Sequence, residues 1–114
     1  MFNYQIIIEY DGTNFVGWQK QKNGPSIQQA IEKTFTKILK EKITLFGSGR
    51  TDSGVHATGQ SAHFLTKFKI NNKLLFLNSI NFFLNKKKIS VLNIIKKKIF
   101  FMQDLMQKKE NISI

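Results

Sequence analysis

The chain has 114 residues, of which 41% are hydrophobic, so we expect one domain. The sequence lacks both the apolar run of a membrane span and the pattern of a signal peptide, so we expect this domain to be cytoplasmic and without membrane contact. It contains no cysteine, which excludes disulfides, thiolate metal sites and cysteine nucleophiles. Its formal net charge of +11 favours a phosphate-bearing partner, with drift toward A/T-rich codons for lysine as the competing explanation.

The first half of the chain predicts a strand, a helix and a second strand. Large apolar side chains alternate with others from Phe2 to Tyr10, which is typical of a strand. A helix follows, and Ser26 and Gln29 fit a capping box at its start. Ile43 to Phe46 then predicts a short strand.

The second half predicts a strand, a helix and a last strand. The first strand starts at Val55 or Ala57 and ends at Thr66. Leu74 to Leu84 is an apolar helix, and Lys88 to Ile95 is the last strand. The order β-α-β-β-α-β is that of the ferredoxin-like α+β fold. We therefore expect one antiparallel sheet with both helices on one face.

The stretch "GSGRTDSGVHATGQ", residues 47–60, joins two of these strands and carries four glycines. It contains the only arginine of the chain, Arg50, two residues before Asp52. Residues two apart on extended backbone project to the same side, and a nearby guanidinium keeps a carboxylate ionised. Such a carboxylate can serve as nucleophile, general base or metal ligand. A surface ion pair on a turn is the alternative.

The two histidines, His56 and His63, lie in or just after this stretch. Together with Asp52 they make a poor metal site, because no second carboxylate lies nearby in the sequence. We therefore expect no metal, and we expect each histidine to be a hydrogen-bonded residue of a strand or loop.

Four stretches of the chain resemble the TruA family of tRNA pseudouridine synthases. "GSGRTDSGVHATGQSAHF" is similar to the family signature G-x-G-R-T-D-x-G-V-H-A-x-G-Q-x-x-H-F. "YDGTNFVGWQKQ" resembles its first motif, "SIQQAIEKTF" its S-V-Q-x-x-L-E helix, and "LNSINFFLNKKKISV" its L-N-x-x-L-P-x-D-I-x-V segment. The chain departs from the family motifs at a few positions. It has Val16 where the family often has histidine, and Ser48 and Ser53 where the family usually has alanine. Lysines stand in place of the family's proline-acid pair before Ile89.

The resemblance implies the N-terminal domain of a two-domain enzyme that isomerises uridine to pseudouridine in the anticodon arm of tRNA, at positions 38, 39 and 40. It implies that Asp52 is the catalytic aspartate, acting either as nucleophile on the sugar or as base toward a sugar proton. Arg50 would pair with Asp52 and would fill the space left by the flipped base or hold a phosphate. The family requires no cofactor and forms homodimers.

Five residues of the matching motifs are expected to bind the RNA. They are Arg50, Thr51, His56, Trp18 and Gln19. For Trp18 a buried core position is the alternative to stacking on a base.

Family members are roughly twice this length or more, and a second similar domain follows the first. There the motif F-H-A-R-F-x-A-x-x-R-x-Y-x-Y comes after the last strand, whereas this chain ends "FFMQDLMQKKENISI". Read two bases later in A/T-rich codons, Phe100 to Ile114 becomes F-H-A-R-F-N-A-K-K-R-K-Y-I-Y, with the motif's first tyrosine at the place of Ile112. We therefore expect residues 1–98 to be the synthase domain and 99–114 a frame-shifted tail. A truncated, non-catalytic RNA-binding domain and a decaying gene product are the alternatives.

Overall fold

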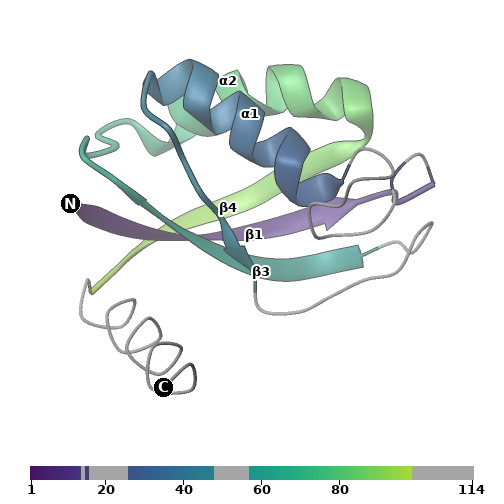
Figure 1. The fold of residues 1–114 in the computed structure, drawn as a ribbon, viewed down its shortest axis with the longest axis horizontal. Coiled ribbons are helices and arrows are strands. Elements are labelled where there is room, and N and C mark those ends of the chain that lie inside the picture. Colours follow the sequence, from purple (N-terminus) through teal and green to yellow (C-terminus); the bar gives the residue numbers. More distant parts are fainter. Residues whose placement is uncertain (14, 16–25, 48–56, 99–114) are drawn as a thin grey trace, which may run out of the picture.

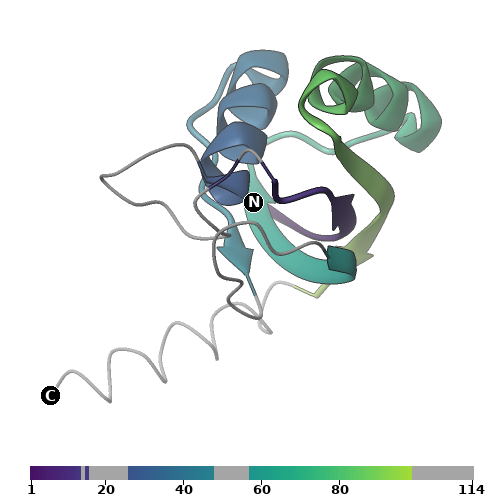
Figure 2. The same ribbon diagram turned by 90° about the vertical axis from the view of Figure 1, so that its right-hand side faces the viewer.

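The computed structural model describes residues 1–13, 15, 26–47 and 57–98. Its elements in chain order are β1 (Phe2–Tyr10), α1 (Ile27–Leu39), β2 (Phe46–Gly47), β3 (Ala57–Thr66), α2 (Lys73–Leu84), the 3-10 helix η1 (Asn85–Lys87) and β4 (Ile89–Lys97). The strands that it describes form one antiparallel sheet in the order β2-β3-β1-β4. Both helices lie on the same side of this sheet (Figures 1 and 2). The predicted α+β fold is confirmed, and the proposed tail lies outside the described residues.

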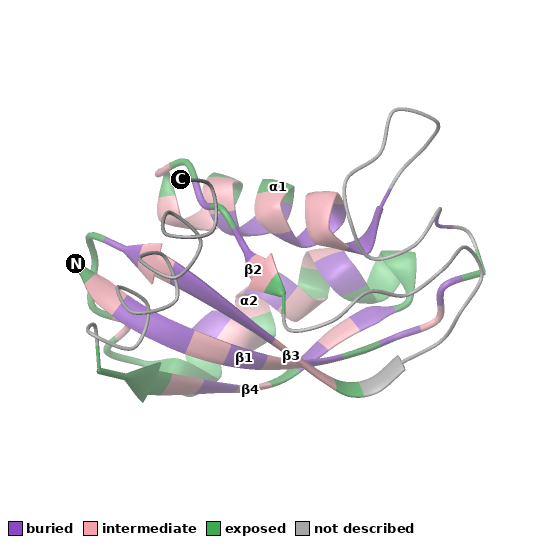
Figure 3. Cartoon of the chain, turned by 60° about the horizontal axis from the view of Figure 1, so that its bottom comes forward, coloured by how far each residue is buried: buried purple, intermediate pink, exposed green. Residues whose placement is uncertain are grey.

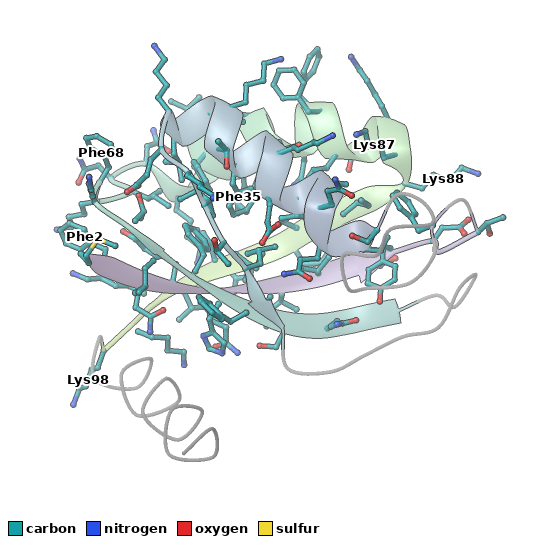
Figure 4. All side chains as sticks on the ribbon, viewed as in Figure 1. Phe2, Phe35, Phe68, Lys87, Lys88 and Lys98 are labelled. Atoms are coloured by element: carbon teal, nitrogen blue, oxygen red, sulfur yellow. The ribbon has the colours of Figure 1, made fainter. Side chains whose placement is uncertain are left out.

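The core fills the space between the helices and the sheet. Every second residue of β1 from Tyr4 to Tyr10 is buried toward the helices, as the alternation predicted. Phe35 of α1 links the layers, because its ring packs edge-on against Phe64 of β3 and Phe76 of α2, with centroids 5.0 and 5.6 Å apart. Figure 4 shows Phe35 between α1 and the sheet. One aromatic side chain thus joins three elements.

Helix α1 begins where the sequence predicted. Ser26 is its N-cap, and the Ser26 hydroxyl accepts a hydrogen bond of 3.1 Å from the backbone N–H of Gln29. The Ser26 carbonyl accepts the first helical bond, from Ala30, at 3.1 Å. The cap fixes the point at which the chain returns from the segment 16–25 to the helix.

The predicted strand from Ile43 to Phe46 is wrong for most of its length, since only its last residue lies in β2. The backbone before β2 bonds to side chains of α1 instead. The N–H of Ile43 donates to the Thr36 hydroxyl at 3.1 Å, and the N–H of Leu45 donates to the Glu32 carboxylate at 2.9 Å. Side chains of α1 therefore accept the hydrogen bonds from backbone N–H groups that a neighbouring strand would otherwise accept.

The last strand is displaced toward the C-terminus relative to the predicted range, Lys88 to Ile95. Lys88 has a left-handed backbone with φ 60°, which ends η1 and delays the strand by one residue. Leu92 bulges out of β4, because Ile7 pairs with Asn93 while the next residue of β1 pairs with Val91. The bulge explains why Leu92 is 48% exposed inside a strand.

Three other bounds can be compared with the prediction. β3 starts at Ala57, while the alternative start at Val55 lies outside the described residues. α2 starts at Lys73, one residue before the predicted helix. Its outer surface carries Leu74, Leu75 and Phe82, all exposed (green on α2 in Figure 3). Within the described ranges, neither this helix nor any other combines the length and apolarity that crossing a bilayer requires.

Candidate active site

All the residues predicted for catalysis or RNA binding lie outside the described residues. They are Asp52, Arg50, Thr51, His56, Trp18 and Gln19. The predicted projection of Arg50 and Asp52 to one side lies outside them too. The structure instead defines the positions at which the two motif segments leave and rejoin the fold. Phe15 and Ser26 flank the first segment, and Gly47 and Ala57 flank the second.

The first motif segment begins, and the second rejoins the sheet, at the same end of the sheet. Tyr10, the last residue of β1, pairs with Ala57 at the start of β3 and with Ile89 at the start of β4. The N–H of Asp11 then donates to the carbonyl of Lys88 at 3.0 Å. The N-terminus of α1 lies at this end as well (right-hand side of Figure 1). The second segment leaves the sheet at Gly47, which pairs with Ala62, and it rejoins the sheet at Ala57, next to the start of the first motif.

A side-chain hydrogen bond ties the two motifs together. The hydroxyl of Tyr10, which is 3% exposed, donates to the side-chain oxygen of Gln60 at 2.7 Å. The side-chain nitrogen of Gln60 is buried and has no hydrogen-bond partner within the described part of the chain. Sequence reasoning missed this pair, although both residues stand in the quoted motifs.

A glycine bulge bends β3 just after the second motif segment. Ile8 pairs with Gln60 and Tyr10 pairs with Ala57, so one residue of β1 faces two residues of β3. Gly59 lies within this irregularity and has φ 78°, in the left-handed region. Such a bulge changes the direction of the strand and of the side chains before it. The sequence indicated glycines for tight turns but not this position.

Gly59→Ala is expected to lower the free energy of unfolding by about 1–2 kcal/mol, the cost of a left-handed backbone for a residue with a Cβ. A Cβ at this position meets nothing within 4 Å, so backbone strain alone acts. Urea denaturation followed by circular dichroism measures the loss. Gly59→Asn is the control, because asparagine adopts this conformation more readily and should lose less. Equal stability of Gly59→Ala and the unchanged chain would contradict the strain argument.

His63 lies in β3, as predicted, between Gln5 of β1 and Phe46 of β2. Burial lowers the pKa of its imidazole below the ordinary value, and the positive charge of Lys97 lowers it further. The side chain is therefore neutral at neutral pH. Among the described residues, no three His, Asp or Glu side chains gather in a way that could hold a metal ion.

A comparison with known protein families identifies the family of this chain. The family model described as tRNA pseudouridine synthase matches residues 6–98. The chain belongs to the tRNA pseudouridine synthase family. The resemblance seen in the motifs is thereby confirmed, and it spans nearly all of the described fold.

Individual members of the tRNA pseudouridine synthase family agree with this result. The protein named tRNA pseudouridine synthase A of Pelagibacter ubique (strain HTCC1062) is 58% identical over 101 residues, which are 89% of this chain and 41% of that protein. That of Ehrlichia ruminantium (strain Gardel) is 48% identical over 94 residues, 80% of this chain and 37% of that protein. The chain thus spans about two fifths of the length of the curated relatives it matches.

Proposed function

We propose that this chain is the N-terminal catalytic part of an enzyme that converts uridine to pseudouridine in the anticodon arm of tRNA. Family membership supports the reaction class. The observation that supports the proposal is the hydrogen bond between Tyr10 and Gln60, because it joins the first residue of the first motif to a residue of the signature. In the cell we expect a cytoplasmic enzyme that acts as a homodimer.

The reacting group in this proposal is the carboxylate of Asp52. The bond between C1′ of the ribose and N1 of uracil breaks, the base turns, and C1′ bonds to C5 instead. C5 loses a proton and N1 gains one, so the product is an isomer of the substrate and no cofactor is consumed. Asp52 either attacks the sugar or removes a sugar proton. The base must first leave the helical stack, since a carboxylate cannot reach it there.

Arg50 has two roles in the proposal. Its guanidinium favours the ionised form of Asp52, which both versions of the chemistry need. It also fills the space left by the flipped base or binds a phosphate, for which its planar fork of donors is suited and lysine is not. Thr51, His56 and the first-motif residues Trp18 and Gln19 would contact the RNA around it.

A chimera tests the proposal. Residues 1–98 of this chain replace the matching part of the Pelagibacter ubique protein, which supplies the remaining length. We expect the chimera to convert uridines of a tRNA anticodon arm, detected as carbodiimide-dependent stops of reverse transcription. The 114-residue chain alone should give no stops, because it spans only part of its relatives and water would reach the reacting groups.

The alternative is an RNA-binding domain without catalysis, favoured by the short span of the chain relative to its relatives. A chimera that is folded by circular dichroism and binds tRNA as tightly as the parent relative, yet gives no stops, would support this alternative and overturn the catalytic proposal. The parent relative is the positive control in the same assay.

A further inference from the structure

A pocket of about 330 Å³ opens beside the first turns of α1. Lys33 reaches it from α1, and Lys86 and Lys87 reach it from η1. None of the described residues that line it is acidic. At about 30 Å³ per water, its volume holds on the order of ten waters, enough for a hydrated phosphate group. The pocket is therefore open, cationic and large enough for an anion.

The pocket lies at the end of the domain where the first motif segment begins and the second rejoins the sheet. Phe15 and Ser26, which line it, are the described residues on either side of the first segment. Figure 4 shows Lys87 and Lys88 at this end, and Phe68 and Lys98 at the other. The bond from the Asp11 N–H to the carbonyl of Lys88 holds the end of η1 beside the loop after β1.

The charges in the pocket repel one another when it holds only water. The N-terminus of α1 carries the positive end of the helix dipole, and its capping residue Ser26 lines the pocket together with Gln29. Lys33, Lys86 and Lys87 contribute three positively charged side chains to its lining. The Nζ of Lys86 lies 4.5 Å from the centroid of the Phe82 ring, which is not among the described lining residues, so an anion would compete with this ring for the ammonium group. An anion would relieve the repulsion and meet helix dipole and lysines together.

We propose that this pocket binds a phosphate of the tRNA backbone next to the catalytic segment. The inference rests on the proposed function, which makes tRNA the substrate. Lys86 stands three residues before Ile89, where the family motif has its proline, so at least this charge of the pocket departs from the motif. The alternative is that Lys86 and Lys87 only complement the C-terminal end of α2, in which case replacing them would leave RNA binding unchanged.

The experiment measures the affinity of the 114-residue chain for an anticodon-arm RNA at several salt concentrations. The variant is Lys86→Gln with Lys87→Gln, and the control is Lys69→Gln with Lys73→Gln. Both doubles remove two positive charges from exposed lysines, but the control changes the opposite end of the domain. Each phosphate contact contributes about 0.7–0.9 to the slope of log affinity against log salt. We expect the Lys86, Lys87 double to lose about one to two units of slope and about tenfold in affinity at low salt. The control should keep its slope.

Three outcomes would overturn the inference, and they separate it from the proposed function. Equal salt slopes for the two double variants would refute the phosphate site without affecting the proposed function. No RNA binding by the unchanged chain at low salt would also refute the phosphate site, while the chimera would still test the proposed function. Inorganic phosphate at matched ionic strength should displace the RNA from the chain no better than chloride does. Strong competition that requires Lys86 and Lys87 would instead assign the pocket to free phosphate.

Discussion

Asp52→Asn is expected to abolish pseudouridine formation by the chimera that carries residues 1–98 of this chain. Asparagine keeps the size of the side chain but removes its charge, so it can neither attack the sugar nor accept a proton. The rate should fall by about 10³-fold or more, as expected when the reacting group of an enzyme is removed. Carbodiimide-dependent reverse-transcription stops measure the product, and a filter-binding titration should show that tRNA still binds.

Glu41→Gln is the matched control for Asp52→Asn. Its carboxylate accepts hydrogen bonds from the Thr66 hydroxyl at 2.6 Å and from the N–H of Lys67, at the end of the sheet away from the motif segments. The Thr66 hydroxyl holds the pKa of Glu41 below its usual value, so this side chain is also ionised at neutral pH. The substitution removes the same charge and should leave conversion unchanged. Near-normal conversion by the Asp52→Asn protein would refute the catalytic assignment.

Phe35→Ala is expected to destabilise the domain by about 3–5 kcal/mol. The side chain is fully buried, and its ring contacts aromatic rings of both β3 and α2, so truncation leaves a cavity that no single element can close. Domains of this kind are stable by about 5–15 kcal/mol, so much of the free energy of unfolding would be lost. Urea denaturation at fixed pH gives the difference.

Phe82→Ala provides the comparison for Phe35→Ala. Phe82 is 63% exposed and packs edge-on against Phe83, with centroids 5.2 Å apart. Its removal should change the free energy of unfolding by about 0.5 kcal/mol, the range of ordinary surface substitutions. If the two variants lost equal stability, Phe35 would not be the link between the layers that its position indicates.

The sequence predicted those parts of the fold that follow from local periodicity. β1 matched from end to end, because its large apolar side chains from Tyr4 to Tyr10 alternate with residues that, in that range, are less buried. The strand before the signature was wrong, because its N–H groups donate to side chains of the preceding helix, Thr36 and Glu32, and strand periodicity carries no signal of such side-chain acceptors. The bulge at Leu92 could not be predicted either, since it appears only as a shift of register against β1.

The candidate site was predicted by resemblance rather than by physical reasoning from the residues. Arg50 and Asp52 stood out by type and spacing, but the same spacing fits an ion pair on a turn. The contact between Tyr10 and Gln60 depends on the register of β1 against β3, which the sequence does not specify. The lysine pocket depends on η1 reaching α1, and these elements are more than forty residues apart in the chain.

The bulge in β4 bears on how the domain behaves in a crowded solution. β4 is the outer strand of the described sheet, nine residues long, and a flat edge of that length is a template for pairing with other chains. Leu92 interrupts the regular spacing of its backbone groups, and exposed Lys96 and Lys97 add charge at its end. A misplaced strand would meet a kink and then two ammonium groups. The irregularity thus protects the domain against edge-to-edge aggregation.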